Sequence, residues 1–282
     1  MTQTQTDPEV ETEEVQTATI VAEVADIEDM IDRTALDGED EHDDLFLDIS
    51  DDEVTVLQSA PGESVLTYGS FYESYFSELS VEGDDSIGAI IRVEQTLDYL
   101  DMTAPTGTVQ LEFSAGDDNL ARYLDITGDL EGRVTLPGSQ EALSNVPDWL
   151  PERFSDDDVY TSSPEAGSKE LPTIIDTKVE SVRRIIEAKR NTGAKTYPIV
   201  VEDGDFKMNI GDDNNFIRGS LSGNSVDGPD VDNNYLSGFE EIFNVMTGRI
   251  QLQTAPGNGP LAVVKGGAKS AVRHVNASVN VE

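Results

Sequence analysis

The order of predicted elements occurs twice along this chain, and this repetition limits its possible folds more than any other feature. Apolar residues alternate, or recur at helical spacing, in the order strand, helix, hairpin-rich strands, helix, strands over residues 17–138, and the same order returns over 171–282. Residues 139–170 show neither period and are rich in Pro, Ser and Asp, which predicts a connector. We therefore expect two similar α+β domains, each with two helices packed on antiparallel sheet.

Four segments carry the helical spacing: residues 25–36, 91–101, 180–191 and 238–246. Thr177 with Glu180, and Ser237 with Glu240, match the capping-box pattern, in which side chains satisfy the free backbone N–H groups of a helix start. Asp203-Gly204 lies between two alternating runs and predicts a tight hairpin. Each half also has a predicted edge strand, over 119–126 in the first and 215–222 in the second.

The charge of the chain is strongly negative, with 57 Asp and Glu against 18 Lys and Arg and a formal net charge of −39. In about 1 M salt the Debye length is only about 3 Å, so the self-repulsion of such a surface is largely screened. The composition therefore indicates adaptation to molar salt, as in halophilic archaea or their viruses. Residues 1–16 contain almost no large apolar side chain and are expected to form a disordered acidic tail.

Several function classes find no support in the composition. Without Cys there is no disulfide or thiolate site, and two isolated His residues, His42 and His274, make neither a triad nor a zinc site. Gly266–Ser270 resembles a phosphate loop only faintly, and the Asp-rich runs do not have the spacing of a calcium loop. No apolar run is long enough for a membrane span, and the N-terminus does not resemble a signal peptide. We expect no catalytic residue, metal or cofactor, and a protein of a high-salt cytoplasm, or of a host cytoplasm if it is viral.

A cluster of cations interrupts this acidic background. Residues 178–195 contain six of the 18 Lys and Arg residues, where random placement would leave about one or two. The six cations are Lys178, Arg183, Arg184, Lys189, Arg190 and Lys195. On a helix, Val182, Ile185 and Ile186 lie together and can pack on the sheet, which leaves a cationic exposed side. A solvated Arg-rich helix is the ordinary explanation, but a cluster kept against the trend of the whole chain indicates a polyanionic partner.

Three segments resemble the PCNA-type DNA sliding clamps. They are YPIVVEDGDFKMNIGDDNNFIRGSL (197–221), YLSGFEEIFNVMTGRIQLQTAPGNGPLAVVK (235–265) and the C-terminal RHVNASV (273–279). The resemblance implies that three subunits form a ring with sheets outside and helices lining the hole. Such a homotrimer encircles duplex DNA and tethers DNA polymerase and other replication or repair enzymes, after a clamp loader has placed it there.

The resemblance also implies roles for particular residues. The six cations would contact DNA phosphates without sequence specificity. A pocket for short hydrophobic partner peptides would be formed by Leu66, Trp149, Leu150, Phe154, Pro260, Val275 and Ala277. Subunit contacts would come from the two predicted edge strands, through Leu120, Tyr123, Phe216 and Ile217.

Some observations leave other functions open. The first predicted helix is acidic, with Asp26, Glu28, Asp29 and Asp32 against Arg33, where the resemblance implies basic residues. Trp149, Leu150 and Phe154 fit equally well as a plain anchor that pins the connector to the body. A β-rich structural protein of a halophilic virus and a monomeric, non-ring processivity factor therefore remain alternatives to the ring.

Overall fold

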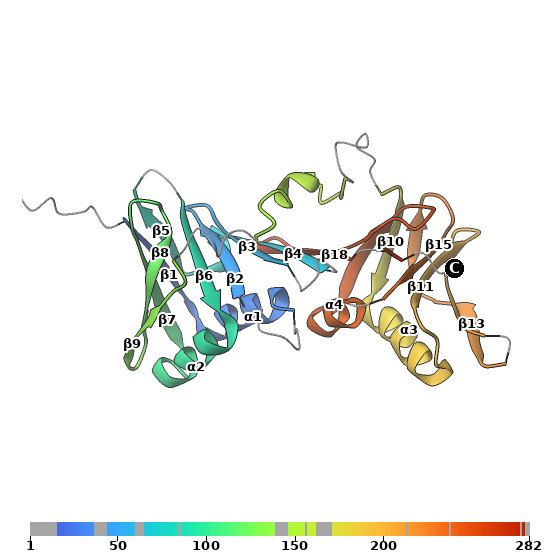
Figure 1. Cartoon of the computed structure of the whole chain (residues 1–282), viewed down its shortest axis with the longest axis horizontal. Helices are drawn as coiled ribbons and strands as arrows, with labels where there is room; N and C mark the ends of the chain where they lie inside the picture. The colour runs from blue at the N-terminus through green and yellow to red at the C-terminus, as the bar shows by residue number, and fades with distance from the viewer. Residues whose placement is uncertain are drawn as a thin grey trace, which may run out of the picture.

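The computed structural model describes residues 16–36, 44–59, 65–83, 86–138, 146–155, 157–161, 171–212, 214–236, 238–276 and 278–279. These residues form two lobes of an arc, with the helices of both lobes on its concave side (Figure 1). The helices are α1 (Val24–Thr34), α2 (Val93–Thr103), α3 (Val179–Thr192) and α4 (Phe239–Val245). Each predicted helix is confirmed, with both ends within two residues of the prediction.

The strands of the first lobe are β1 (Gln16–Glu23), β2 (Asp44–Ile49), β3 (Glu53–Ser59), β4 (Val65–Tyr72), β5 (Glu78–Glu82), β6 (Ile87–Arg92), β7 (Thr108–Ala115), β8 (Ala121–Thr127) and β9 (Glu131–Thr135). Those of the second lobe are β10 (Thr173–Lys178), β11 (Tyr197–Glu202), β12 (Asp205–Gly211), β13 (Phe216–Ser220), β14 (Ser225–Asp227), β15 (Val231–Tyr235), β16 (Arg249–Thr254), β17 (Leu261–Gly266), β18 (Ser270–Asn276) and β19 (Ser278–Val279). Two short 3₁₀ turns, η2 (Glu73–Tyr75) and η4 (Pro151–Arg153), lie between them.

The two lobes repeat one strand plan. Five strands of the first lobe are ordered β5-β1-β7-β8-β9, and five of the second are ordered β14-β10-β16-β17-β18. The remaining strands follow the matching orders β6-β2-β3-β4 and β15-β11-β12-β13, with β19 added beside β15. All described strand pairs are antiparallel, so the fold is α+β as predicted. The exact boundaries of tail, domains and connector stay predictions.

The lobes are joined through a single continuous sheet. β18 of the second lobe pairs with β4 of the first, and the resulting sheet has nine strands. By the repeated plan, the strands equivalent to β18 and β4 are β9 and β13. Both are outermost in their sheets, with no strand beyond them among the described residues, and they lie at the two ends of the arc (Figure 1).

This arrangement corrects one predicted edge. The strand within 119–126, β8, is covered by β9, because residues 131–135 fold back and pair with it from Tyr123↔Thr135 to Thr127↔Glu131. The edge of the first lobe is therefore β9. The other predicted edge, β13, is confirmed as the outer strand of its sheet.

Buried apolar side chains hold the helices on the sheets. Ile27 and Ile31 of α1, and Ile185 of α3, are each at most 1% exposed. On α4, Phe239 and Phe243 are fully buried, and the Phe239 ring stacks on Tyr197 with 4.6 Å between ring centres. Full burial of such a side chain contributes about 1.5–3 kcal/mol to folding, so each helix is held mainly by one apolar face.

The capping boxes were predicted wrongly where the structure describes them. Helix α3 begins after Lys178, no side chain caps its start, and the Thr177 hydroxyl instead donates to Asn224 Oδ1 over 2.5 Å. Thr177 is still part of β10, so its side chain serves the sheet. Helix α4 follows Gly238, again without a side-chain cap, and Ser237 lies outside the described residues. The Asp203-Gly204 hairpin is confirmed, with φ values of 56° and 76° as a type I′ turn requires.

Candidate nucleic-acid interface and partner surface

Helix α3 places the cation cluster on the concave side of the arc (Figure 1). Val182, Ile185 and Ile186 are buried against the sheet, as the helical spacing predicts. Lys178, Arg183, Arg184, Arg190 and Lys195 are exposed, and Lys189 is half-buried. The predicted apolar underside and cationic outer side of this helix are therefore both present.

Three of the six cations also brace α3 against α4. Arg183 Nη2 donates to the backbone carbonyls of Phe243 and Met246, each over 3.2 Å, and so caps the end of α4. Arg190 pairs with Glu240 at 2.7 Å, and this guanidinium holds the pKa of the Glu240 carboxyl below its usual range.

The third bracing cation, Lys189, lies over the ring of Tyr197, with its Nζ 4.1 Å from the ring centre and 2.8 Å from the phenol oxygen. The Tyr197 hydroxyl donates to Glu240 Oε1, and burial together with this carboxylate raises the pKa of the phenol. The network keeps the cationic side of α3 in a fixed orientation.

The side chains of the other three cations have no internal partner. Within the described part of the chain, the side chains of Lys178, Arg184 and Lys195 make no hydrogen bond or ion pair. Exposed Arg249 stands opposite Lys178 in the β10–β16 ladder, and it lines a shallow pocket beside the connector together with Asp176 and Lys265. Sequence reasoning missed Arg249 because only the strand pairing brings it beside Lys178.

The remaining concave helices are acidic. The charged residues of α1 are Asp26, Glu28, Asp29, Asp32 and Arg33, those of α2 are Glu94, Asp98 and Asp101, and those of α4 are Glu240 and Glu241. Arg33 is drawn inward, where its guanidinium pairs with Asp29 at 3.1 Å and stands over the Phe71 ring. Attraction for a polyanion is therefore confined to the second lobe.

The outer, convex side of the nine-stranded sheet carries an apolar patch under the connector. Its buried members are Leu150, Tyr160, Leu171, Ala262 and Val275, and Leu66, Tyr68, Phe154 and Ala255 pack against them. The structure thus brings together four predicted pocket residues: Leu66, Leu150, Phe154 and Val275. Sequence reasoning missed Tyr68 and Tyr160, whose rings complete the patch.

Two predicted pocket residues lie outside this patch, and a third is not among the described residues. Trp149 is 42% exposed, with the Arg153 guanidinium 5.3 Å from its ring centre. Pro260 is half-buried just before β17, and Ala277 lies outside the described residues. The peptide pocket itself stays a prediction.

The predicted subunit-contact residues differ in accessibility. Tyr123 and Phe216 are 44% and 53% exposed, and each ring lies under an arginine, Arg133 and Arg218 respectively. Ile217 is partly exposed on β13. Leu120, which directly precedes the inner strand β8, is by contrast only 2% exposed, so its side chain is buried within the subunit and is not a contact surface.

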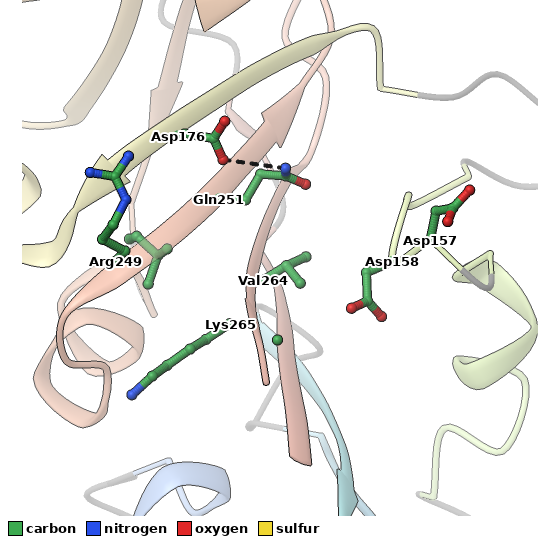
Figure 2. Close-up of a pocket in the computed structure, with 9 residues that line it drawn as sticks. Asp157, Asp158, Asp176, Arg249, Gln251, Val264 and Lys265 are labelled. Atoms are coloured by element: carbon green, nitrogen blue, oxygen red, sulfur yellow. Dashed lines mark hydrogen bonds between the residues drawn. The ribbon is translucent and has the colours of Figure 1, made fainter. Parts of the chain in front are cut away.

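Beside the connector, a shallow pocket of about 250 Å³ opens between β10, β16 and β17. Figure 2 shows Asp176 hydrogen-bonded to Gln251 at its far side, and Asp157 and Asp158 at its connector side. Among the described residues no group of His, Cys, Asp or Glu has the arrangement of a metal site. Within the same residues, no helix is long and apolar enough to cross a membrane.

No family model and no curated protein sequence matches this chain. Solved structures match it closely in shape. A. fulgidus PCNA, in a structure with the C-terminal region of FEN-1 bound, superposes with a TM-score of 0.69 at 13% identity and covers 94% of this chain and 99% of its own.

Two further structures agree. PCNA from Thermococcus kodakaraensis gives a TM-score of 0.65 at 14% identity, covering 93% of this chain and 100% of its own. A putative DNA polymerase III beta subunit from Eubacterium rectale gives 0.67 at 12% identity, covering 99% of this chain and 68% of its own. The chain therefore has the fold of the PCNA-type sliding clamps over nearly its whole length.

Proposed function

We propose that this chain, which has the sliding-clamp fold, is the subunit of a homotrimeric ring that encircles duplex DNA. The ring would have no catalysis of its own and would tether DNA polymerase and other replication or repair enzymes, after loading by a clamp loader. The observation that carries the proposal is the β4–β18 junction, combined with the two edge strands β9 and β13 at the ends of the arc, beyond which no further strand lies among the described residues.

The junction inside the chain serves as a template for the contact between chains. β18 ends one five-strand set and pairs with β4, which ends a four-strand set. β9 ends the equivalent five-strand set of the first lobe, and β13 ends the equivalent four-strand set of the second lobe. Among the described strands, neither has a strand paired to its outer edge. A second copy can supply it, with β9 of one copy pairing with β13 of the next. This contact is heterologous, so it must close into a ring or continue as a fibre.

The repeated plan also gives the register of this contact. The ladder Ile175, Leu252, Val263, His274 of the second lobe corresponds to Ile20, Leu111, Ile126, Gly132 of the first. On the other side, Gly219 of β13 takes the place of Gly69 of β4, since Met208↔Gly219 repeats Val56↔Gly69. Because His274 pairs with Thr67, Gly132 would pair with Ile217 of the next copy.

In this register complementary side chains would lie opposite each other. Glu131 would face Arg218, and Arg133 would face Phe216. Arg218 lies over its own Phe216 ring at 4.5 Å, and Arg133 pairs with Asp125 at 2.6 Å, so both arginines are held at the edges before assembly. An opposite charge pair and an aromatic–cation pair each favour strand pairing by up to about 1 kcal/mol.

DNA would contact the ring through α3. In the proposed assembly the concave helices face the hole, and Arg184, Lys178 and Lys195 have no internal partner among the described residues. We infer that these three bind phosphates most directly and that Arg183, Lys189 and Arg190 mainly hold α3 in place. Phosphate contacts weaken steeply with salt, but a closed ring stays on the duplex by topology, so three cationic patches per ring suffice.

The oligomeric state in molar KCl tests the proposal. Light scattering should give about three times the chain mass of 30.6 kDa. Transfer to low salt should shift the mass toward the monomer, because three chains of charge −39 repel over a Debye length of about 10 Å at 0.1 M. A monomer at molar salt and micromolar protein would refute the ring and favour a non-ring processivity factor.

A further inference from the structure

The connector fills the apolar patch of the outer sheet with its own side chains. Phe154 lies between Tyr68 and Tyr160, with ring centres 6.0 and 5.2 Å away, and Leu150 is fully buried. Tyr160 is 7% exposed. A partner peptide with an aromatic side chain would need this same surface, which is already occupied.

One buried arginine holds the connector in this position. Arg273 of β18 is 6% exposed, and its guanidinium lies over Tyr68 at 4.5 Å and over Phe154 at 5.6 Å. Its Nε donates to Asp158 Oδ1 over 2.7 Å, and its Nη2 donates to the same oxygen. The ring of Phe154 and the carboxylate of Asp158 thus both contact the Arg273 side chain of β18.

Backbone hydrogen bonds of residues 153–161 also hold the connector on the sheet. Thr161 N–H donates to the Arg153 carbonyl over 2.7 Å, which draws the two ends of the segment together. The side chain of Gln253 accepts from Tyr160 N–H and donates to the Asp158 carbonyl, each over 2.8 Å. The segment is therefore a compact loop that is bonded to the sheet and is not a plain spacer.

We propose that Phe154, Asp158 and Tyr160 form an internal plug, and that a partner must displace it to bind. This inference rests on the tethering of partner enzymes proposed above and on the peptide pocket that the clamp resemblance predicts at the connector. The plug also indicates the chemistry of the partner, which must replace the contacts of Phe154 and Asp158. The partner would insert an aromatic side chain between Tyr68 and Val275, and an acidic residue that follows it would pair with Arg273 in place of Asp158. A partner binds only those protein molecules in which the plug is open. The apparent Kd for the partner is therefore the intrinsic Kd divided by the fraction of protein molecules with an open plug.

The test uses Asp158→Asn, with Asp157→Asn as matched control. Both remove one negative charge, but only Asp158 bonds to Arg273, and Figure 2 shows the Asp157 carboxylate pointing away from the strand of Val264 and Lys265. Hydrogen exchange of the Ser155, Tyr160 and Thr161 amides should accelerate about tenfold in Asp158→Asn and stay unchanged in the control.

The binding probe is a synthetic peptide of residues 150–161, LPERFSDDDVYT, the plug itself supplied in trans. It should bind Asp158→Asn about tenfold more tightly than the unmodified protein or the control, and lose that gain when its own copy of Asp158 is changed to Asn. Equal binding by all three proteins would overturn the plug, as would unchanged exchange. If the plug behaves as stated while peptides from polymerases fail to bind, only the proposed function fails.

Discussion

His274 is a fully buried titratable residue at the junction of the two lobes. Its Nδ1 lies 2.9 Å from Thr67 Oγ1 of the neighbouring strand, so the contact crosses from one lobe to the other. Burial, with a smaller contribution from the nearby Arg33 cation, lowers the pKa of His274 from 6.5 to about 3. The ring is therefore neutral in the folded chain at every pH at which the clamp would work.

The buried imidazole makes stability depend on pH. Below pH 6.5 the unfolded chain binds a proton that the folded chain cannot bind until about pH 3, so the free energy of unfolding falls across this window. Between pH 7 and pH 5 the loss should be about 2 kcal/mol. In His274→Gln this part of the loss should disappear. Guanidinium titrations of both proteins at the two pH values measure the difference, and equal losses would contradict the neutral, buried ring.

Arg184 differs from its neighbour Arg183 in having no internal partner among the described residues. Arg184→Gln should therefore weaken duplex binding and reduce the slope of log affinity against log salt by about 1 for each subunit whose Arg184 contacts a phosphate, up to about 3 for the ring, while stability stays unchanged. Arg183→Gln should instead destabilise the α3–α4 contact. Fluorescence anisotropy with a labelled duplex over a KCl series checks this, with Lys207→Gln as a control cation outside α3. A slope unchanged by Arg184→Gln would remove this residue from the DNA contact.

At the scale of elements, the helices and most strands could be predicted because each has its own period. The spacing of Val182, Ile185 and Ile186 is enough to identify the buried side of α3. Strands β14 and β15 are not predicted by the sequence, because Asp227, Asp230 and Asp232 mask the alternation of apolar residues. Their pairing with β10 and β11 stabilises them, and local sequence does not contain that information.

The choice of edge strand failed for a related physical reason. Both β8 and β9 alternate correctly, and only the order of pairing decides which one is outermost. The partner patch was only partly predicted. The clamp resemblance implied Leu66 and Val275, but Tyr68 and Arg273 come together with them only through the β4–β18 ladder, and Tyr160 joins them only through the fold of the connector. The period of apolar residues within a segment cannot predict contacts that depend on pairing between strands far apart in the sequence.

The strand register gives a prediction that belongs to β9 and β13. Arg218→Glu would set two carboxylates opposite each other across each subunit contact and weaken it by about 1–2 kcal/mol. Adding Glu131→Arg should restore assembly, because opposite charges then face each other again, with the signs exchanged between the two strands. Light scattering over a protein dilution series measures the change. Lys207→Glu, one strand further in, should leave assembly unchanged, and failure of the reversed pair to rescue would mean that the register is wrong.

At the scale of the whole molecule, the acidic surface and the proposed ring would depend on each other. A clamp that relied on attraction alone would leave DNA in molar salt, because counterion release then yields little free energy. In the proposed ring, encirclement would remove that dependence and would let the chain keep acidic α1 and α2 on its concave side. The cationic patch on α3 would then need only to orient the duplex within the hole.

Encirclement can be tested directly because the chain contains no Cys. Glu131→Cys with Arg218→Cys places one thiol at each end of the arc, so a disulfide can form only between copies. Directly opposite residues of an antiparallel pair have Cα atoms about 4.5–5.5 Å apart, which suits a disulfide. Oxidation in molar KCl should stop at covalent trimers on a denaturing gel. A ladder that continues beyond three chains would mean a fibre.

The same variant distinguishes encirclement from surface binding. Dissociated subunits would be mixed with circular DNA in low salt, brought to molar KCl so that they assemble, and then oxidised. Trimers closed around the circle should remain with it in detergent, since only a covalent break can release them, and cutting the circle once should free them. Protein lost from the intact circle in detergent would show that the chain binds beside the duplex and not around it.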